Sequence, residues 1–180
     1  MSSKIKKVNY KLFQNEIKTL LNIKEPVKKL ILSKPSKINS KQKIILNKIL
    51  NKIPDYKNKD ILKSFNNTDI SIHKLTNKKQ NKMSKIYKDE DCCSYEIKKT
   101  IIIFLDIDKK LKNNGPEIFY KCEGWIFKNY KVINKFIPKT GDIIIFDSNI
   151  YHGQSDIFED DTEKVKNRYY LEIQLGSERE

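Results

Sequence analysis

One histidine and one arginine lie at the ends of apolar segments in the C-terminal half of the chain. His152 comes just after the apolar run 143–146, and Arg168 opens the alternating segment 168–175. A neutral imidazole nitrogen can bind a divalent metal, and a guanidinium can hold a carboxylate through two parallel hydrogen bonds without losing its charge. In an antiparallel barrel, both side chains can point into the same open end. We therefore expect a site for a metal and a carboxylate at His152 and Arg168.

Short apolar segments separated by turn signals surround these two residues. The run 100–105 is continuous and β-branched, which is typical of a strand buried on both faces. Turns are indicated by Asn113 to Pro116 and by Thr140 to Asp142. Further strands are expected at 70–75, 117–120, 124–127, 132–137, 143–146 and 168–175. Short strands at this spacing favour a sandwich or a barrel.

The N-terminal part of the chain predicts helices. Apolar residues recur at helical spacing from Leu12 to Leu21, and Glu25-Pro26 ends that element. Ser40 is expected to cap a second helix that ends near Pro54. Its expected apolar stripe consists of Ile44, Ile45, Ile49, Leu50 and Ile53.

Both predicted helices carry lysines on the face opposite their apolar residues, as helices packed on another element do. We therefore expect an α+β fold of two parts. Residues 1–66 form the helical, lysine-rich part, and residues 67–176 form the barrel on which it packs.

The order of these strands, turns and polar residues resembles the Fe(II)/2-oxoglutarate-dependent dioxygenases, and in particular their prolyl hydroxylase-like branch. The resemblance is carried by the run 100–105, Asn114-Gly115, the segment 136–141 leading into 143–146, His152 and Arg168. It implies a double-stranded β-helix, which is a jelly-roll of the cupin kind. It also implies Fe(II) as the metal and 2-oxoglutarate as the co-substrate. His152 takes the place of the distal iron ligand, and Arg168 that of the residue that clasps the far carboxylate of 2-oxoglutarate.

The chain departs from this family at the His-x-Asp motif that supplies the first two iron ligands. Residues 86–93 read Ile-Tyr-Lys-Asp-Glu-Asp-Cys-Cys and contain no histidine. One register puts Asp89 in place of the histidine and keeps Asp91 as the carboxylate. The other puts Tyr87 in place of the histidine and keeps Asp89. The first gives an Asp/Asp/His site, which is more anionic than the family's ligand set, and the second gives only Asp and His.

Three further residues are candidates for the same pocket. His73 is the only other histidine, and it is either a ligand that folds back or a residue of a surface strand. In the resembling family the strand at 100–105 often contributes a tyrosine to the co-substrate, and Phe104 stands at that position without a hydroxyl. Tyr170 is assigned to the co-substrate pocket as well, although ordinary strand packing also explains Tyr169 and Tyr170.

The net charge of +14 raises the possibility of a nucleic-acid partner. Residues 1–88 carry 23 Lys and Arg against 5 Asp and Glu, whereas residues 89–180 carry 14 against 18. The excess is almost entirely lysine beside abundant Asn and Ile, a mixture that an A+T-rich genome encodes without selection for a ligand. A solvated lysine surface and a polyanion-binding face in the N-terminal half both explain the charge.

The sequence also bears on where the protein works. No apolar run approaches the roughly 20 residues that a membrane helix needs. The first residues lack the apolar stretch of a signal peptide. Cys92, Cys93 and Cys122 do not make a disulfide framework, since two of them are adjacent. We expect an intracellular protein, cytoplasmic or nuclear, without a membrane partner.

Three functions are compatible with these features. The first is an oxygenase that uses Fe(II), 2-oxoglutarate and O2 to hydroxylate a protein or another substrate. The second is the same barrel without catalysis, acting as a protein-binding module. The third is a basic protein that binds nucleic acid through its N-terminal helices, in which case binding weakens steeply with salt.

Overall fold

The computed structural model describes residues 5–22, 38–53, 68–76, 86, 88–89, 95–107, 117–123, 129–154 and 167–178. Their helices are α1 (Gln14–Leu21) and α2 (Ser40–Leu50). Their strands are β1 (Lys6–Lys7), β2 (Thr68–Thr76), β3 (Tyr95–Ile107), β4 (Glu117–Glu123), β5 (Asn129–Phe136), β6 (Ile143–Asp147), β7 (Tyr151–Gln154) and β8 (Asn167–Glu178).

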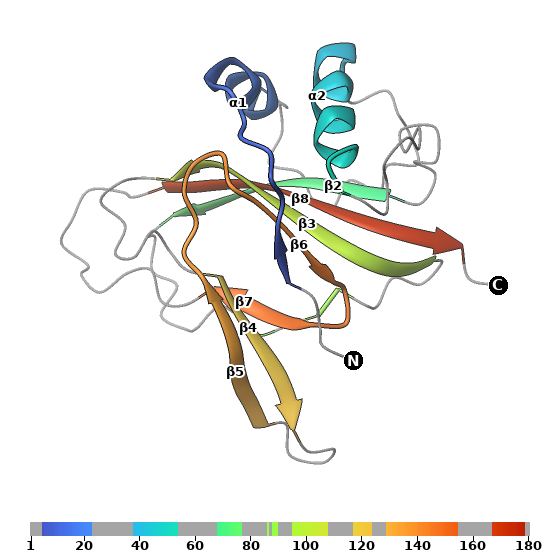
Figure 1. Cartoon of the computed structure of the whole chain (residues 1–180), viewed down its shortest axis with the longest axis vertical. Coiled ribbons are helices and arrows are strands. Elements are labelled where there is room, and N and C mark those ends of the chain that lie inside the picture. The colour runs from blue at the N-terminus through green and yellow to red at the C-terminus, as the bar shows by residue number, and fades with distance from the viewer. Residues whose placement is uncertain are drawn as a thin grey trace.

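The strands form two antiparallel sheets. The larger has the order β1-β6-β3-β8-β2 and the smaller the order β5-β4-β7 (Figure 1). From β3 onward the chain crosses repeatedly between the sheets, because β3, β6 and β8 lie in the larger one while β4, β5 and β7 lie in the smaller one. Two facing antiparallel sheets joined by such crossings form a jelly-roll. The predicted jelly-roll fold is confirmed.

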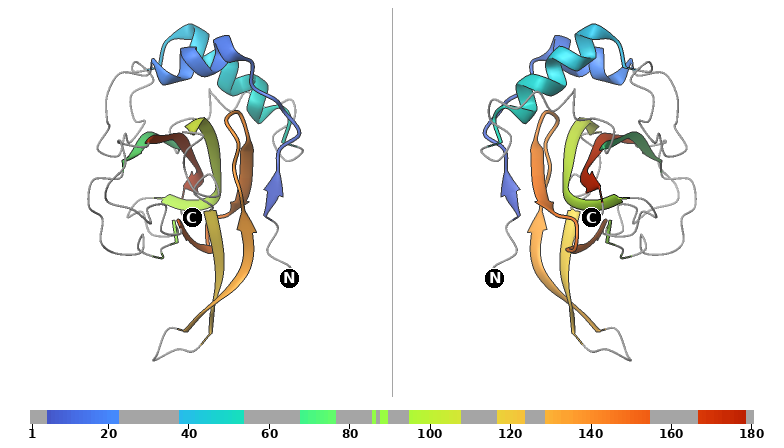
Figure 2. Two further views of the ribbon diagram at one scale, coloured as in Figure 1. Left: turned by 90° about the vertical axis from the view of Figure 1, so that its left-hand side faces the viewer. Right: turned by 90° about the vertical axis from the view of Figure 1, so that its right-hand side faces the viewer.

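The outer face of the five-stranded sheet belongs to the same hydrophobic cluster as the two helices. Ile101, Ile103 and Leu105 of β3 join Leu171 and neighbouring residues of β6 and β8 in this cluster. The helices contribute the buried side chains Ile17, Leu20, Ile45, Leu46, Ile49 and Leu50. Each aliphatic side chain removed from water here stabilises the fold by about 1.5–3 kcal/mol. Figure 2 shows both helices on the same side of this sheet.

The opposite face of the five-stranded sheet contributes to a second hydrophobic cluster. Ile102 and Phe104 of β3 pack with Phe146 of β6, Tyr170 of β8 and Phe119 of β4. Because successive residues of a strand point to opposite faces, β3 is buried on both sides. This burial explains the continuous apolar run at 100–105.

Two details of the predicted second helix are wrong. Asn39, and not Ser40, caps it, because the Asn39 side chain accepts a hydrogen bond from the backbone N–H of Gln42. The Gln42 side chain accepts in return from the N–H of Asn39, which completes a capping box. Ile44 is 55% exposed, whereas Leu46, which the predicted stripe omits, is fully buried.

The strand boundaries also differ from the predictions. β4 runs on to Glu123, and β5 begins at Asn129. The short strands β1 and β7 were not predicted, since neither carries an alternating pattern of useful length. The predicted strand at 124–127 lies outside the described residues, as do residues 54–67, where the two predicted parts of the chain meet. Within the described residues, no helix is long and apolar enough to cross a membrane.

Candidate metal centre

His152 lies in the interior of the jelly-roll. It belongs to β7, where it is directly opposite Phe119 of β4. Its ring centroid is 4.7 Å from that of Phe146, which it meets edge-on, and 6.4 Å from that of Phe119. The residue is 0% exposed. Two phenylalanines, one from each sheet, therefore border the imidazole.

Asp89 is attached to the five-stranded side of the same interior. Its backbone N–H donates to the carbonyl of Ser148, just beyond β6, with an N···O distance of 3.1 Å. Its carboxylate oxygen Oδ2 accepts a hydrogen bond from the hydroxyl of Thr100 at 2.6 Å. The side chain is 3% exposed. A main-chain bond and a side-chain bond thus fix both the position and the direction of this carboxylate.

The residue before Asp89 makes a contact with the smaller sheet. The Lys88 ammonium lies 5.8 Å from the centre of the Tyr151 ring, which is within the range of a cation–π interaction. Tyr151 directly precedes His152 in β7. The segment 88–89 therefore contacts both sheets.

The carboxylate and the imidazole face each other across this interior. The distance from His152 Nε2 to Asp89 Oδ2 is 3.7 Å. The other ring nitrogen, Nδ1, lies 3.1 Å from the carbonyl oxygen of Ile150. Since a carbonyl only accepts, Nδ1 is the donor in this contact, and a neutral ring then keeps its lone pair on Nε2. Nε2 thus faces a carboxylate oxygen at 3.7 Å, a contact that a bound cation or a proton between the two atoms would stabilise.

The pair meets the requirements for two ligands of one metal ion. Ligand atoms about 2.1 Å from a shared ion, a bond length typical of zinc sites, are at most about 4.2 Å apart. The observed 3.7 Å is within this limit. An imidazole and a carboxylate are two of the three ligands of the facial triad of non-haem Fe(II) oxygenases. Within the described part of the chain, no third His, Cys, Asp or Glu joins them.

The structure brings together two of the predicted site residues, and it describes others only in part. Asp91 and Tyr87 lie outside the described residues, so neither register of the degenerate motif is excluded. Of Arg168, only the backbone position is described: it lies in β8, opposite Ile107 of β3 and Leu75 of β2. The role assigned to its side chain stays a prediction.

Phe104, Tyr170 and His73 occupy one row of the larger sheet. Phe104 pairs with Tyr170, which pairs in turn with His73 across β8 and β2. Phe104 is fully buried, with its ring stacked on Phe136 at a centroid distance of 5.8 Å. Tyr170 is buried in the same cluster. Of His73, only the backbone is described.

Sequence reasoning missed Thr100 and Ser148 as parts of this site. Thr100 holds the Asp89 carboxylate, and Ser148 contributes both the carbonyl that accepts from Asp89 and a hydroxyl that donates to the carbonyl of Ile97. One signal for Thr100 was available, because it is the single hydroxyl at the head of a run of apolar residues. No comparable signal marks Ser148, which follows β6 in a turn.

The fold is similar to that of viral collagen prolyl hydroxylase from Paramecium Bursaria Chlorella virus-1. A truncated form of that protein superposes with a TM-score of 0.50 at 15% sequence identity, covering 94% of this chain and 88% of that one. Its 2OG complex gives a TM-score of 0.42 at 16% identity, with 94% of each chain covered. IDO from Bacillus thuringiensis gives 0.44 at 12% identity, over 79% of this chain and 61% of that one.

No protein-family model matches this chain, and no curated protein matches its sequence. At 15% identity, the first of the structural similarities establishes the fold. The jelly-roll of this chain is thus the fold on which the viral hydroxylase is built.

Proposed function

We propose that this protein is an Fe(II)/2-oxoglutarate-dependent oxygenase in which Asp89 and His152 hold the metal. The observation that carries the proposal is the buried carboxylate oxygen of Asp89, 3.7 Å from Nε2 of a buried imidazole whose other nitrogen contacts a backbone carbonyl. Bringing a carboxylate and an imidazole nitrogen together inside an apolar interior costs free energy unless a cation or a proton lies between them. A divalent metal is the cation that this donor set suits.

Each residue has a defined part in this proposal. The carbonyl of Ile150 orients the imidazole through Nδ1, and the Thr100 hydroxyl orients the carboxylate, as the residues behind metal ligands commonly do. Arg168 is proposed to clasp the far carboxylate of 2-oxoglutarate. When bound, iron and 2-oxoglutarate supply the activation of O2 for hydroxylation. The phenylalanines around His152 limit the access of water to that chemistry.

The decisive experiment measures metal binding. Fe(II) or Mn(II) loaded without oxygen should bind the wild-type protein at one ion per chain, and both His152→Ala and Asp89→Ala should abolish binding. Equal metal content in wild type and His152→Ala would contradict the proposal. Circular dichroism should show that each variant remains folded, and Lys131→Ala, on the exposed strand β5, provides a variant distant from the site.

The same measurement identifies the third ligand. Asp91→Asn and His73→Ala remove the two candidates one at a time, and the variant with the larger loss of affinity names the ligand. If both bind the metal as the wild type does, solvent completes the coordination.

Binding of 2-oxoglutarate tests the proposed role of Arg168. The chain contains a single further arginine, Arg179, which provides a matched control. Arg168→Ala should weaken 2-oxoglutarate binding to the metal-loaded protein at least tenfold, or about 1.4 kcal/mol, whereas Arg179→Ala should leave it unchanged. Equal affinities in both variants would show that the carboxylate clasp is assigned to the wrong residue.

Release of succinate from 2-oxoglutarate tests turnover. It is measured first without substrate and then with proline-containing peptides, the kind of substrate that the name of the viral collagen prolyl hydroxylase indicates.

A second candidate function is a barrel that binds a protein without catalysis. It is favoured by one observation, the absence of histidine from residues 86–93. A protein that binds neither metal nor 2-oxoglutarate would support this second function.

A further inference from the structure

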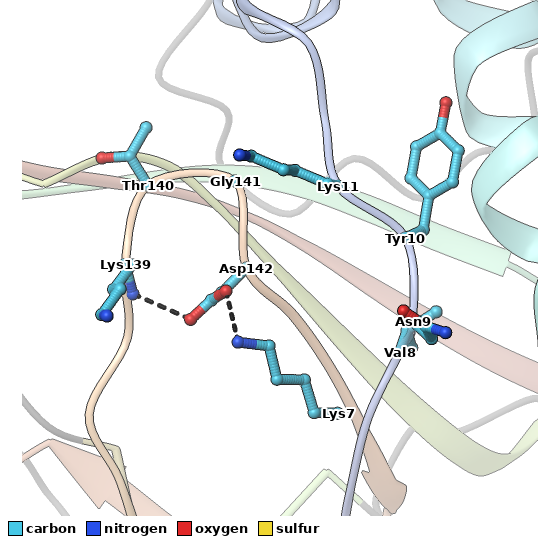
Figure 3. Close-up of a pocket in the computed structure, with 9 residues that line it drawn as sticks. All are labelled: Lys7, Val8, Asn9, Tyr10, Lys11, Lys139, Thr140, Gly141 and Asp142. Carbon is cyan, nitrogen blue, oxygen red and sulfur yellow. Dashed lines mark hydrogen bonds and ion pairs between the residues drawn. The ribbon is translucent and has the colours of Figure 1, made fainter.

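A second site of a different kind lies between the N-terminal segment and the turn before β6. A cavity of about 450 Å³ is lined there by residues 7–11 and 139–142 (Figure 3). Its polar side chains include the lysines Lys7, Lys11 and Lys139, together with Thr140 and Asp142. None of these residues belongs to the metal centre proposed above.

Main-chain hydrogen bonds hold both walls of this cavity in place. On one side, the N–H of Val8 donates to the carbonyl of Ile143 at 2.9 Å, so the segment after β1 is fastened to β6. On the other side, the N–H of Gly141 donates to the carbonyl of Phe104 at 2.7 Å. Gly141 has a φ of +89°, a conformation that residues with a Cβ rarely adopt. The cavity is therefore a feature of the folded chain and not of side-chain rotamers alone.

The charge of the lining is positive. Asp142 is its single acidic side chain, and this carboxylate already accepts from the Lys7 ammonium at 2.6 Å and from the Lys139 backbone N–H at 3.0 Å. The ammonium groups of Lys11 and Lys139 form no ion pair with any other described residue. Lys11 extends toward the turn at residues 140–142 (Figure 3). Within the described part of the chain, no carboxylate therefore competes with a ligand for these two ammonium groups.

A hydroxyl group complements these charges. The Thr140 oxygen accepts a hydrogen bond from the backbone N–H of Ile107 at 3.1 Å, which leaves its own hydrogen free to be donated. Tyr10 is committed elsewhere, because its hydroxyl donates to the Glu16 carboxylate at 3.0 Å. The lining therefore offers three donors, the ammonium groups of Lys11 and Lys139 and the hydroxyl of Thr140, whereas the charge of Lys7 is balanced by Asp142.

We propose that this cavity binds a phosphate group carried by a small phosphorylated molecule. A phosphate has several acceptor oxygens and up to two negative charges, and hydrogen bonds between ammonium groups and phosphate are among the strong, charge-assisted ones. The proposal is independent of the oxygenase function, since it involves neither Asp89 nor His152. The proposal concerns only the lysines that line this cavity. The lysine excess of the N-terminal half as a whole can be explained by codon bias.

The experiment uses pyrophosphate as the probe, with the whole chain at low salt. The double variant Lys11→Gln/Lys139→Gln removes two charges from the cavity. The control Lys41→Gln/Lys52→Gln removes two charges from α2 and the turn that follows it, where both lysines are exposed. Isothermal titration should give saturable binding at one site per wild-type chain. The cavity variant should weaken it at least tenfold, and the control by less than twofold.

Two results would overturn the proposal. One is that the wild type shows no saturable binding of pyrophosphate. The other is that the cavity variant and the control weaken binding equally, because nonspecific attraction by the surface lysines would then explain it. Thermal unfolding of each variant excludes loss of structure as the cause. If the cavity variant unfolds, phosphorus NMR of pyrophosphate with the single variant Lys11→Gln replaces it, with the same expected loss.

A short single-stranded oligonucleotide distinguishes the source of the phosphate. If pyrophosphate displaces the oligonucleotide, and if oligonucleotide binding depends on Lys11 and Lys139, the site is supported. In that case a nucleic acid can also supply the phosphate group that the cavity binds. Oligonucleotide binding that is unchanged in the cavity variant, without binding of pyrophosphate, contradicts it.

Discussion

The two sheets of the jelly-roll differ in how they are covered. The five-stranded sheet shares one hydrophobic cluster with the helices on its outer face and contributes to a second one on its inner face. The three-stranded sheet contributes Phe119 to the inner cluster, whereas its strand β5 is exposed at most positions. Figure 1 shows the β4–β5 hairpin extending away from the rest of the fold. The larger sheet is therefore buried on both faces, whereas the smaller one packs against it through the inner cluster.

The proposed metal ligands come from opposite sides of this division. Asp89 is bonded to Thr100 of β3 and to Ser148 after β6, so it is tied to the covered sheet. His152 belongs to β7 of the smaller sheet. A metal held by both would therefore link the two sheets, and the geometry of the site depends on how firmly the smaller sheet is docked.

The largest effect is expected from a cavity in the covered sheet. Leu171 of β8 is fully buried in the cluster that includes the helices. Leu171→Ala should lower the free energy of unfolding by about 2–5 kcal/mol, because the lost burial adds to the cost of the cavity. Val132 of β5 is 55% exposed, and Val132→Ala should change the free energy of unfolding by less than about 0.5 kcal/mol. Denaturant unfolding monitored by circular dichroism measures both.

Similar losses in the two variants would contradict the difference between the sheets. That result would mean that β5 is covered in solution by something other than the described residues.

An intermediate effect is expected where the two sheets meet. Thr100→Val keeps the shape of the side chain and removes the hydroxyl that donates to the buried Asp89 carboxylate. A hydrogen bond to a charged group contributes about 1.5–3 kcal/mol, so unfolding should become easier by about 2 kcal/mol. Mn(II) affinity should fall as well, because the carboxylate loses its orienting partner. Thr100→Ser, which restores the hydroxyl, should recover most of both quantities, and an unaltered Thr100→Val protein would argue against a fixed Asp89.

The smallest effect concerns the helical cover. Burial, together with the hydrogen bond to Glu16 and its negative charge, raises the pKa of Tyr10 to about 12, against about 10 for a free tyrosine. The folded chain thus holds this phenolic proton more tightly than the unfolded chain does. The resulting stabilisation is complete below pH 10 and is lost as the pH rises to about 12.

The measurement is the difference in unfolding free energy between wild type and Tyr10→Phe as a function of pH. The advantage of the wild type should be constant up to about pH 10 and should then decrease. Comparing the two proteins cancels the titration of the many lysines. A difference that does not change between pH 9 and 12 would show that Tyr10 titrates as an exposed tyrosine does.

The parts of the fold that the sequence predicts are those with a periodic burial pattern. The strand at 100–105 was predicted because both of its faces are buried, and the two helices because their apolar residues recur at helical spacing. β1 and β7 were not predicted because strands of two and four residues are too short to display a period. What defines them is pairing with β6 and β4, and these contacts are distant in sequence.

The candidate site was predictable only where chemistry marks a residue type. His152 was identified because the chain has only two histidines and this one follows a buried strand. Asp89 and Asp91 were equivalent in sequence, and it is the hydrogen bond from Thr100 that gives Asp89 a defined direction. The lysines of the phosphate cavity were indistinguishable from the other lysines, because a cavity arises from the folding of two segments that lie far apart in the chain.

The exposed strand β5 has a further consequence, for solubility. Among the described strands it pairs only with β4, so its other edge presents backbone donors and acceptors to a second copy of the chain. The exposed side chains Val132 and Ile133 would favour such edge-to-edge growth. Lys131 and Lys135 lie on the same strand, and two copies joined there would bring like charges together. Lysines that an A+T-rich genome encodes readily would in this way keep the protein from aggregating.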